Sequence, residues 1–189
     1  MEYRLTTERL RLEPLAYAHA GAFLRYRVRN REHLKPFEPA RPDEAYTRAA
    51  VIEEIEIAEG FAADQRGFTF AVFEREGDEI VALVHLLHVI RAARHSATIA
   101  YSVDVDQQGR GIATEAAAAV IRFAFDELDL HRLETGYFPH NIASGKVLRK
   151  LGFNVEGYAR DYLFIDGAWR DSILVSLINE RWRDAGRGR

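Results

Sequence analysis

The sequence has 189 residues, of which 48% are hydrophobic, and it carries a formal net charge of −3 with no cysteine. A chain of this length can bury a sizeable core, and we expect a single domain over residues 1–189. The missing cysteines exclude disulfides, zinc–thiolate sites and thiol nucleophiles, and the slightly acidic balance disfavours a broad nucleic-acid surface, so no DNA partner is expected.

The first half of the chain predicts two helices and an antiparallel meander. Residues 10–15 alternate as in a strand, and residues 17–30 and 43–59 have helical apolar spacing. Residues 68–73 and 80–88 then predict a β-hairpin, because a polar turn containing Gly77 separates them.

The third strand of this meander, residues 97–105, runs into a glycine loop that opens an alanine-rich helix. Apolar residues at helical spacing form one stripe of that helix. They are Ala117, Val120, Ile121, Ala124, Phe125 and Leu128.

The last quarter predicts a strand, a helix and a hairpin. Residues 132–137 form the strand, and Asn141 is a good N-cap for a helix that ends at Gly152. The hairpin pairs residues 156–164 with 169–177. We expect the charged tail, residues 180–189, to be frayed.

The glycine loop predicts an anion site. Without a Cβ at Gly109 and Gly111, backbone N–H groups can approach a phosphate, and the following helix adds its positive dipole end. A P-loop is excluded because no Lys-Ser/Thr pair follows Gly111, and a dinucleotide fingerprint would need glycine at Thr114. A simple tight turn is the structural alternative.

Two motifs carry a family resemblance. Gln108-x-x-Gly111-x-Ala113, at its strand-to-helix junction, resembles the coenzyme A pyrophosphate loop of the GNAT N-acetyltransferases. Residues 141–153 resemble the second cofactor-contacting helix of that family, and residues 31–39, 156–162 and 166–171 resemble the ribosomal-protein-alanine N-acetyltransferases of the RimJ/RimL type, closer to the RimJ side.

The resemblance implies a single α/β GNAT domain with a mixed, mostly antiparallel sheet of about six or seven strands and about four flanking helices. It implies acetyl-CoA as cosubstrate, with direct acetyl transfer to an amine. It also implies a set of cofactor-binding residues along the strand, the loop and the second helix. They are Val103, Val105, Gln108, Gly109, Arg110, Gly111, Ile112, Ala113, Thr114, Asn141 and Ser144.

Three residues are candidates for the chemistry. Ser144 is the candidate proton donor to the leaving thiolate, because Leu148 stands where many GNAT enzymes have a tyrosine. Glu134 is the candidate general base through water, with pairing to Arg132 as the alternative, and Asp161 is the nearest carboxylate where some relatives have a glutamate. For Asn141 and Ser144 the alternative is an ordinary cap and a first-turn serine.

An acceptor follows from the absence of an obvious strong base. An α-amine has a pKa near 7.7–8.0, whereas a lysine side chain has one of about 10.4, so a weak base suits an N-terminal amine. The resemblance to the RimJ/RimL type then implies the alanine or serine N-terminus of a ribosomal protein as acceptor. A small-molecule amine, or a noncatalytic acyl-CoA-binding or ribosome-associated factor, is the alternative.

Other expectations concern location and ligands. The first residues lack the apolar segment of a signal peptide, and no stretch approaches about 18 uncharged apolar residues, so we expect a cytoplasmic protein without membrane contact. It is expected to be a monomer or homodimer. His85 and His88 lie three apart on a predicted strand and point to opposite faces, so no metal site is expected.

Overall fold

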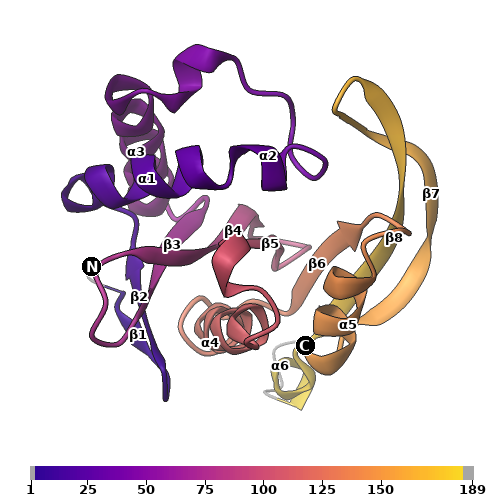
Figure 1. The fold of residues 1–189 in the computed structure, drawn as a ribbon. Helices are drawn as coiled ribbons and strands as arrows, with labels where there is room; N and C mark the ends of the chain where they lie inside the picture. Colours follow the sequence, from indigo (N-terminus) through magenta and orange to yellow (C-terminus); the bar gives the residue numbers. More distant parts are fainter. Residues whose placement is uncertain (1–2, 185–189) are drawn as a thin grey trace.

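The structure is a computed structural model in which residues 3–184 are described. Eight strands form one sheet in the order β1-β2-β3-β4-β5-β6-β8-β7 (Figure 1). Their bounds are Leu5–Thr6 (β1), Leu10–Pro14 (β2), Phe68–Glu74 (β3), Ile80–Ile90 (β4), Ser96–Val103 (β5), Arg132–Tyr137 (β6), Asn154–Ile165 (β7) and Ala168–Ile178 (β8). Neighbours are antiparallel except β5 and β6, which confirms the predicted mixed sheet. The short β1 takes the count above the predicted six or seven.

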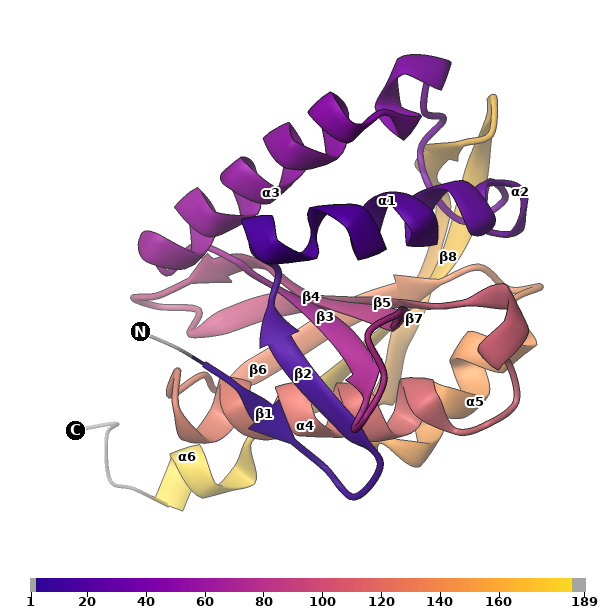
Figure 2. The same cartoon turned by 60° about the vertical axis from the view of Figure 1, so that its left-hand side comes forward.

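Helices cover both faces of the sheet, α1 and α3 on one and α4 and α5 on the other (Figure 2). The α-helices span Ala20–Arg29 (α1), Arg31–Leu34 (α2), Arg48–Ala63 (α3), Ile112–Asp126 (α4), Ile142–Lys150 (α5) and Glu180–Asp184 (α6). Short 3-10 turns span Tyr17–His19 (η1), Asp43–Tyr46 (η2) and Val105–Gln107 (η3). The four predicted helices are present, and the one-turn α2 and α6 are additional.

Helix α4 fixes the larger core. Ala117, Val120 and Ala124 of the predicted stripe are fully buried against the sheet. The sequence pattern did not single out Phe123, whose ring packs edge-on against Phe68 at 5.3 Å. Small alanines let α4 approach the sheet closely, so the start of this helix is held firmly beside the end of β5.

Helix α6 corrects the prediction for the C-terminal tail. Residues 180–184 are helical rather than frayed, because the Trp182 indole Nε1 donates to the Asp129 carbonyl at 3.2 Å and its ring lies 5.1 Å from the His131 ring. Residues 185–189 of the predicted tail lie outside the described part of the chain.

Strands β5 and β6 separate partway along their length, and we call this opening the fork. The two strands pair only from Ser96 to Thr98 on β5 and from Arg132 to Glu134 on β6. Beyond Glu134, β6 continues to pair with β8. The backbone of β5 after Thr98 therefore has an open edge in the middle of the sheet.

The hairpin of β7 and β8 projects beyond the rest of the sheet (Figure 1). Its outer part carries exposed aromatic side chains. They are Tyr158, Tyr162, Phe164 and Trp169, each at least 50% exposed.

Candidate active site

The glycine loop lies between η3 and α4 and has the conformation that an anion cradle requires. Gly109 and Gly111 have φ values of +74° and +79°, a region that side-chain-bearing residues rarely adopt. Gly111 is the N-cap of α4, and no side chain caps the helix. The first N–H groups of a helix have no intrahelical acceptor, so those at Ile112 to Thr114 face outward with the positive helix end.

The space beside the loop backbone bears on the predicted pyrophosphate site. A Cβ at Gly109 would meet no atom within 4 Å, so open space surrounds the backbone there. A Cβ at Gly111 would lie 3.5 Å from Arg9 Nη2, an ordinary van der Waals contact, so the positive φ and not a lack of space favours glycine there. The described residues thus offer a phosphate both unpaired N–H groups and room to approach them.

The open edge of β5 exposes the backbone of Val103 toward the fork. The Asp104 N–H donates to the Val81 carbonyl of β4 at 2.9 Å. Because backbone groups alternate along a strand, the N–H and carbonyl of Val103 point the opposite way, toward the fork. This orientation suits the cofactor-binding role expected for Val103, because its backbone groups could pair with an extended amide chain of the cofactor.

Side chains satisfy two of the polar groups near this edge. The Gln108 amide Nε2 donates to the Val103 carbonyl at 2.9 Å. The Val105 N–H donates to Asn30 Oδ1 at 2.7 Å. Val105 also lies in η3, so the strand ends two residues earlier than predicted. Its expected contact with the cofactor would have to use a group other than this N–H.

A buried carboxylate anchors the end of β5. Asp104 is 1% exposed, and its Oδ2 accepts from Arg29 Nε at 2.6 Å and from Asn30 Nδ2 at 3.0 Å. Burial opposes ionisation, but the hydrogen bonds from Asn30 and Arg29 outweigh it, so the pKa of Asp104 lies below its usual value. The C-terminal end of α1 is thereby fixed to the segment that begins the loop. The sequence analysis did not identify this role of Asn30.

The Arg110 side chain turns toward the protein. Its Nη2 lies 2.9 Å from Glu74 Oε1, and its Nη1 donates to Gln107. Its carbonyl accepts from Arg9 Nη1 at 3.0 Å. Arg110 would therefore contribute its backbone to the cradle unless these pairs open.

Helix α5 begins at the fork opposite the loop. Asn141 caps it, since its Oδ1 accepts from the Ser144 N–H at 3.1 Å. The Ser144 hydroxyl lies 3.0 Å from the Tyr101 hydroxyl of β5. This contact joins β5 to the first turn of α5. Burial raises the pKa of Tyr101 to about 12, so its hydroxyl stays protonated at neutral pH.

The sequence analysis missed Tyr101. On β5 it shares a face with Val103, two residues further along the strand, and this period-2 pattern was its only sequence signal.

Glu134 lies where the fork begins, and basic side chains hold its carboxylate. Oε1 is 2.7 Å from Arg94 Nη2, and Oε2 is 3.2 Å from Arg132 Nε. The pairing with Arg132 considered from sequence is therefore present. A role for Glu134 as base stays a prediction, and it would have to operate within this ion-paired arrangement.

Asp161, the candidate carboxylate of the hairpin, lies in an irregular part of β7. A bulge interrupts the β7–β8 register between Ala159 and Leu163, and Asp161 has a φ of +48°. Its N–H donates to Asp171 Oδ1 at 2.9 Å. Asp161 is exposed on the projecting hairpin and is not part of the contact between Tyr101 and Ser144.

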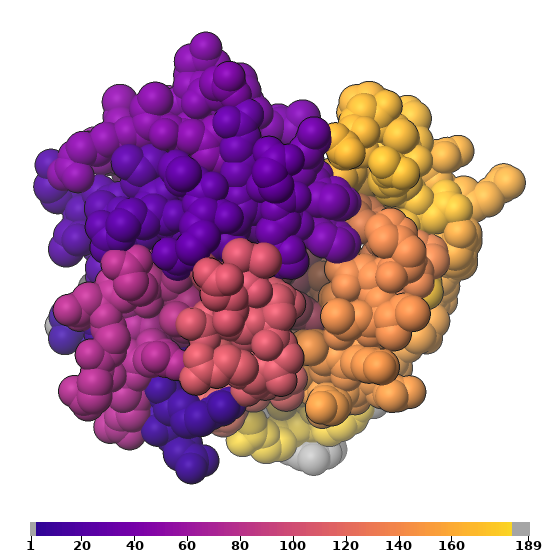
Figure 3. Space-filling view, in the orientation of Figure 1, coloured from indigo at the N-terminus to yellow at the C-terminus, as the bar shows by residue number. Residues whose placement is uncertain are grey.

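Three aromatic rings lie close together next to the end of α2. Phe37 follows α2 and stacks with its ring centroid 6.5 Å from that of Phe138 and 6.4 Å from that of His140. Figure 3 shows a hollow between the segment that begins α4 and the segment that leads into α5. Phe37 is 38% exposed, so part of its ring is open to solvent.

Within residues 3–184 no three or more His, Asp or Glu side chains are grouped to hold a metal ion. No helix of this part of the chain is long and apolar enough to span a bilayer.

Comparison with known proteins bears on this geometry. The acetyltransferase (GNAT) domain model matches residues 9–154. The [ribosomal protein uS5]-alanine N-acetyltransferase of Escherichia coli (strain K12) is 35% identical over 179 residues, which cover 95% of this chain and 92% of that protein.

Two solved structures have the same fold. The ribosomal-protein-S5-alanine acetyltransferase from Vibrio fischeri superposes with a TM-score of 0.91 and 33% identity, covering 95% of this chain and 98% of that chain. Mycobacterium smegmatis RimJ, solved in complex with CoA-disulfide, superposes with a TM-score of 0.87 and 30% identity, covering 95% of this chain and 88% of that chain.

Proposed function

The chain belongs to the GNAT acetyltransferase family and transfers the acetyl group of acetyl-CoA to an amine, and we propose that its acceptor is the N-terminal α-amine of a ribosomal protein. The proposed first residue of that acceptor is alanine or serine. The observation that carries the proposal is the similarity to the uS5-alanine enzyme, which extends over nearly the whole of both chains.

The fork supports direct transfer between cofactor and amine. Acetyl-CoA supplies an activated acyl thioester, which the amine nitrogen attacks as the C–N bond forms and the C–S bond breaks. The Val103 N–H, directed into the fork, is suited to stabilise negative charge on the carbonyl oxygen. The Ser144 hydroxyl, supported by Tyr101, is suited to give a proton to the departing thiolate.

The state of the carboxylates beside the fork supports the proposal that the acceptor is an amine of low pKa. Glu134 is held by two guanidinium groups, and Asp104 is buried in bonds to Arg29 and Asn30. Deprotonating an α-amine at pH 7.5 costs well under about 1 kcal/mol, whereas a lysine costs about 4 kcal/mol. A site whose carboxylates are already engaged therefore favours an α-amine.

The test is mass spectrometry of ribosomal-protein N-termini in cells that contain or lack this protein. Cells that express a Gly111→Val variant provide the control for an effect of protein level. We expect one N-terminal alanine or serine peptide to lose acetylation both in cells lacking the protein and in cells with the variant. Unchanged N-termini together with rapid acetylation of polyamines by the purified enzyme would instead establish the small-molecule alternative.

A further inference from the structure

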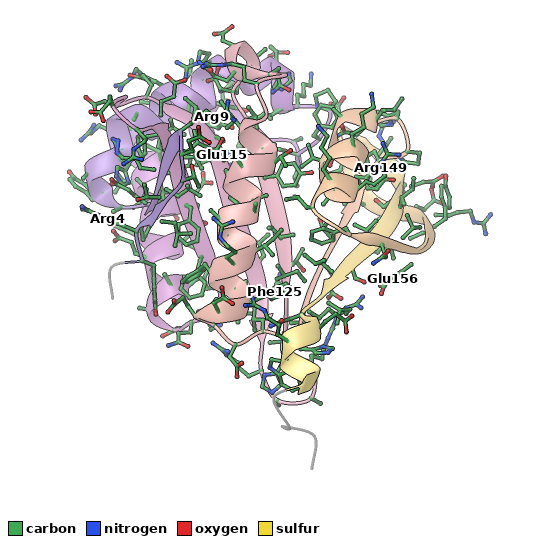
Figure 4. The ribbon with its side chains drawn as sticks, turned by 90° about the horizontal axis from the view of Figure 1, so that it is seen from below. Arg4, Arg9, Glu115, Phe125, Arg149 and Glu156 are labelled. Carbon is green, nitrogen blue, oxygen red and sulfur yellow. The ribbon has the colours of Figure 1, made fainter. Side chains whose placement is uncertain are left out.

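Arg9, in the turn between β1 and β2, reaches across to the beginning of α4. Its Nε donates to Glu115 Oε2 at 2.7 Å, and its Nη1 donates to the Arg110 carbonyl at 3.0 Å. Figure 4 shows the side chains of Arg9 and Glu115 together at this end of the helix. One guanidinium group thus binds a side chain of α4 and the backbone of the glycine loop.

The bond to the Arg110 carbonyl orients the next N–H group. In a trans peptide the carbonyl and the following N–H point in opposite directions. With the Arg110 carbonyl bound to Arg9, the Gly111 N–H must point away from Arg9. Gly111, at φ +79°, would otherwise let this peptide plane rotate with little steric resistance.

Arg9 also offsets a charge that opposes anion binding. Glu115 lies in the first turn of α4, where a carboxylate is favourable for the helix but repels a phosphate. Burial opposes its ionisation, yet the hydrogen bonds from Thr7 and Arg9 outweigh burial, so the pKa of Glu115 lies below its usual value and the group is charged at neutral pH. The Arg9 guanidinium, 2.5 Å from Glu115 Oε2, neutralises it.

The geometry points to Arg9 as a positioning residue for the pyrophosphate of acetyl-CoA. It aims the Gly111 N–H at the phosphate site by holding the Arg110 carbonyl, and it cancels the charge of Glu115 beside that site. Arg9 acts through the loop backbone and not by a contact with the adenosine 3′-phosphate.

The test measures the affinity of each protein variant for three ligands by thermal-shift titration. The ligands are CoA, dephospho-CoA, which retains the pyrophosphate, and pantetheine, which has no phosphate. Arg9→Gln should weaken CoA and dephospho-CoA equally, by about fivefold to tenfold, and leave pantetheine unchanged. Arg9→Lys should recover part of the loss, because it keeps the charge but not the two-point bond.

Arg75 provides the matched control. It lies near the same turn, donates from Nη1 to the Thr7 carbonyl at 3.3 Å and is exposed, so Arg75→Gln removes the same charge without releasing the loop. Arg75→Gln should leave all three affinities unchanged.

Three results would overturn the inference. Equal weakening of all three ligands would make Arg9 a general structural contact, and a loss confined to CoA would indicate direct binding of the 3′-phosphate. Unchanged affinities in a folded Arg9→Gln protein would remove Arg9 from the site altogether. Because CoA binding and acceptor choice are measured separately, each of these outcomes leaves the proposed acceptor untouched.

Discussion

The two sides of the fork are constructed differently. On the β5 side, buried Asp104 binds Arg29 and Asn30 and so ties the end of α1 to the segment that begins the glycine loop. On the β6 side, the sheet ends in a projecting hairpin with exposed aromatic rings and a bulge at Asp161. This difference underlies our proposal that the backbone on the β5 side positions the thioester and that the acceptor brings an amine that is easily deprotonated.

The largest expected effect comes from loosening the fixed side at Asp104. Asp104→Asn removes the charge that Arg29 and Asn30 bind, and it should lower the free energy of unfolding at pH 7 by about 3 kcal/mol. Denaturant unfolding measures this, with exposed Asp106→Asn as the control that makes the same charge change. A stability within about 0.5 kcal/mol of the native protein would show that Asp104 is no anchor.

The same variant has a predictable pH dependence. The pKa of Asp104 is lower in the folded state than in the unfolded state, where it is about 3.9. The stability it contributes is therefore fully present above that unfolded value and is lost as pH falls through the folded pKa. The difference between native protein and Asp104→Asn should thus narrow at pH 3.

The next prediction concerns Ser144, which lies in α5. Ser144→Ala should lower kcat by about 10²-fold and leave acetyl-CoA affinity nearly unchanged, because a proton donor matters only as charge develops on sulfur. Tyr101→Phe, which removes the neighbouring hydroxyl and keeps the ring, should have a smaller effect. A native rate in Ser144→Ala would leave water as the acid.

The backbone cradle is tested with two glycines of like conformation. Gly111→Val should weaken acetyl-CoA binding by tenfold or more in calorimetry, since valine is strained at φ +79° and would shift the loop backbone that offers its N–H groups. Gly167, at φ +73° in the turn between β7 and β8, is the control, because valine there creates similar strain far from the loop. Equal cofactor affinities in the two folded variants would argue against the cradle.

The smallest effect is expected at Glu134. Glu134→Gln should lower the rate only a few-fold, mainly at low pH, and the loss should shrink as pH rises toward about 9, where more of the amine is already neutral. A defect that does not change with pH would assign Glu134 to the ion pairs with Arg94 and Arg132.

The parts of the structure that could be predicted from the sequence are those that depend on residues close together in the chain. The Gln108-to-Ala113 loop, the Asn141 cap and the turn at Gly167 each depend on neighbouring residues, and their positions are confirmed by the structure. The link between Asn30 and Val105 and the contact between Tyr101 and Ser144 join residues more than 40 positions apart, so no local pattern reveals them. The Asp161 bulge breaks the period-2 alternation from which its side-chain direction was inferred.

The proposed reaction needs an acceptor amine of low pKa. The direct measurement compares two peptides of identical sequence, one with a free N-terminal alanine and one with that end blocked and an internal lysine available. At pH 7.5 the free α-amine should turn over much faster, and the lysine peptide should gain rate steeply as pH rises toward its pKa of about 10.4. Equal rates at pH 7.5 would contradict the account, because the site would then have to deprotonate lysine by itself.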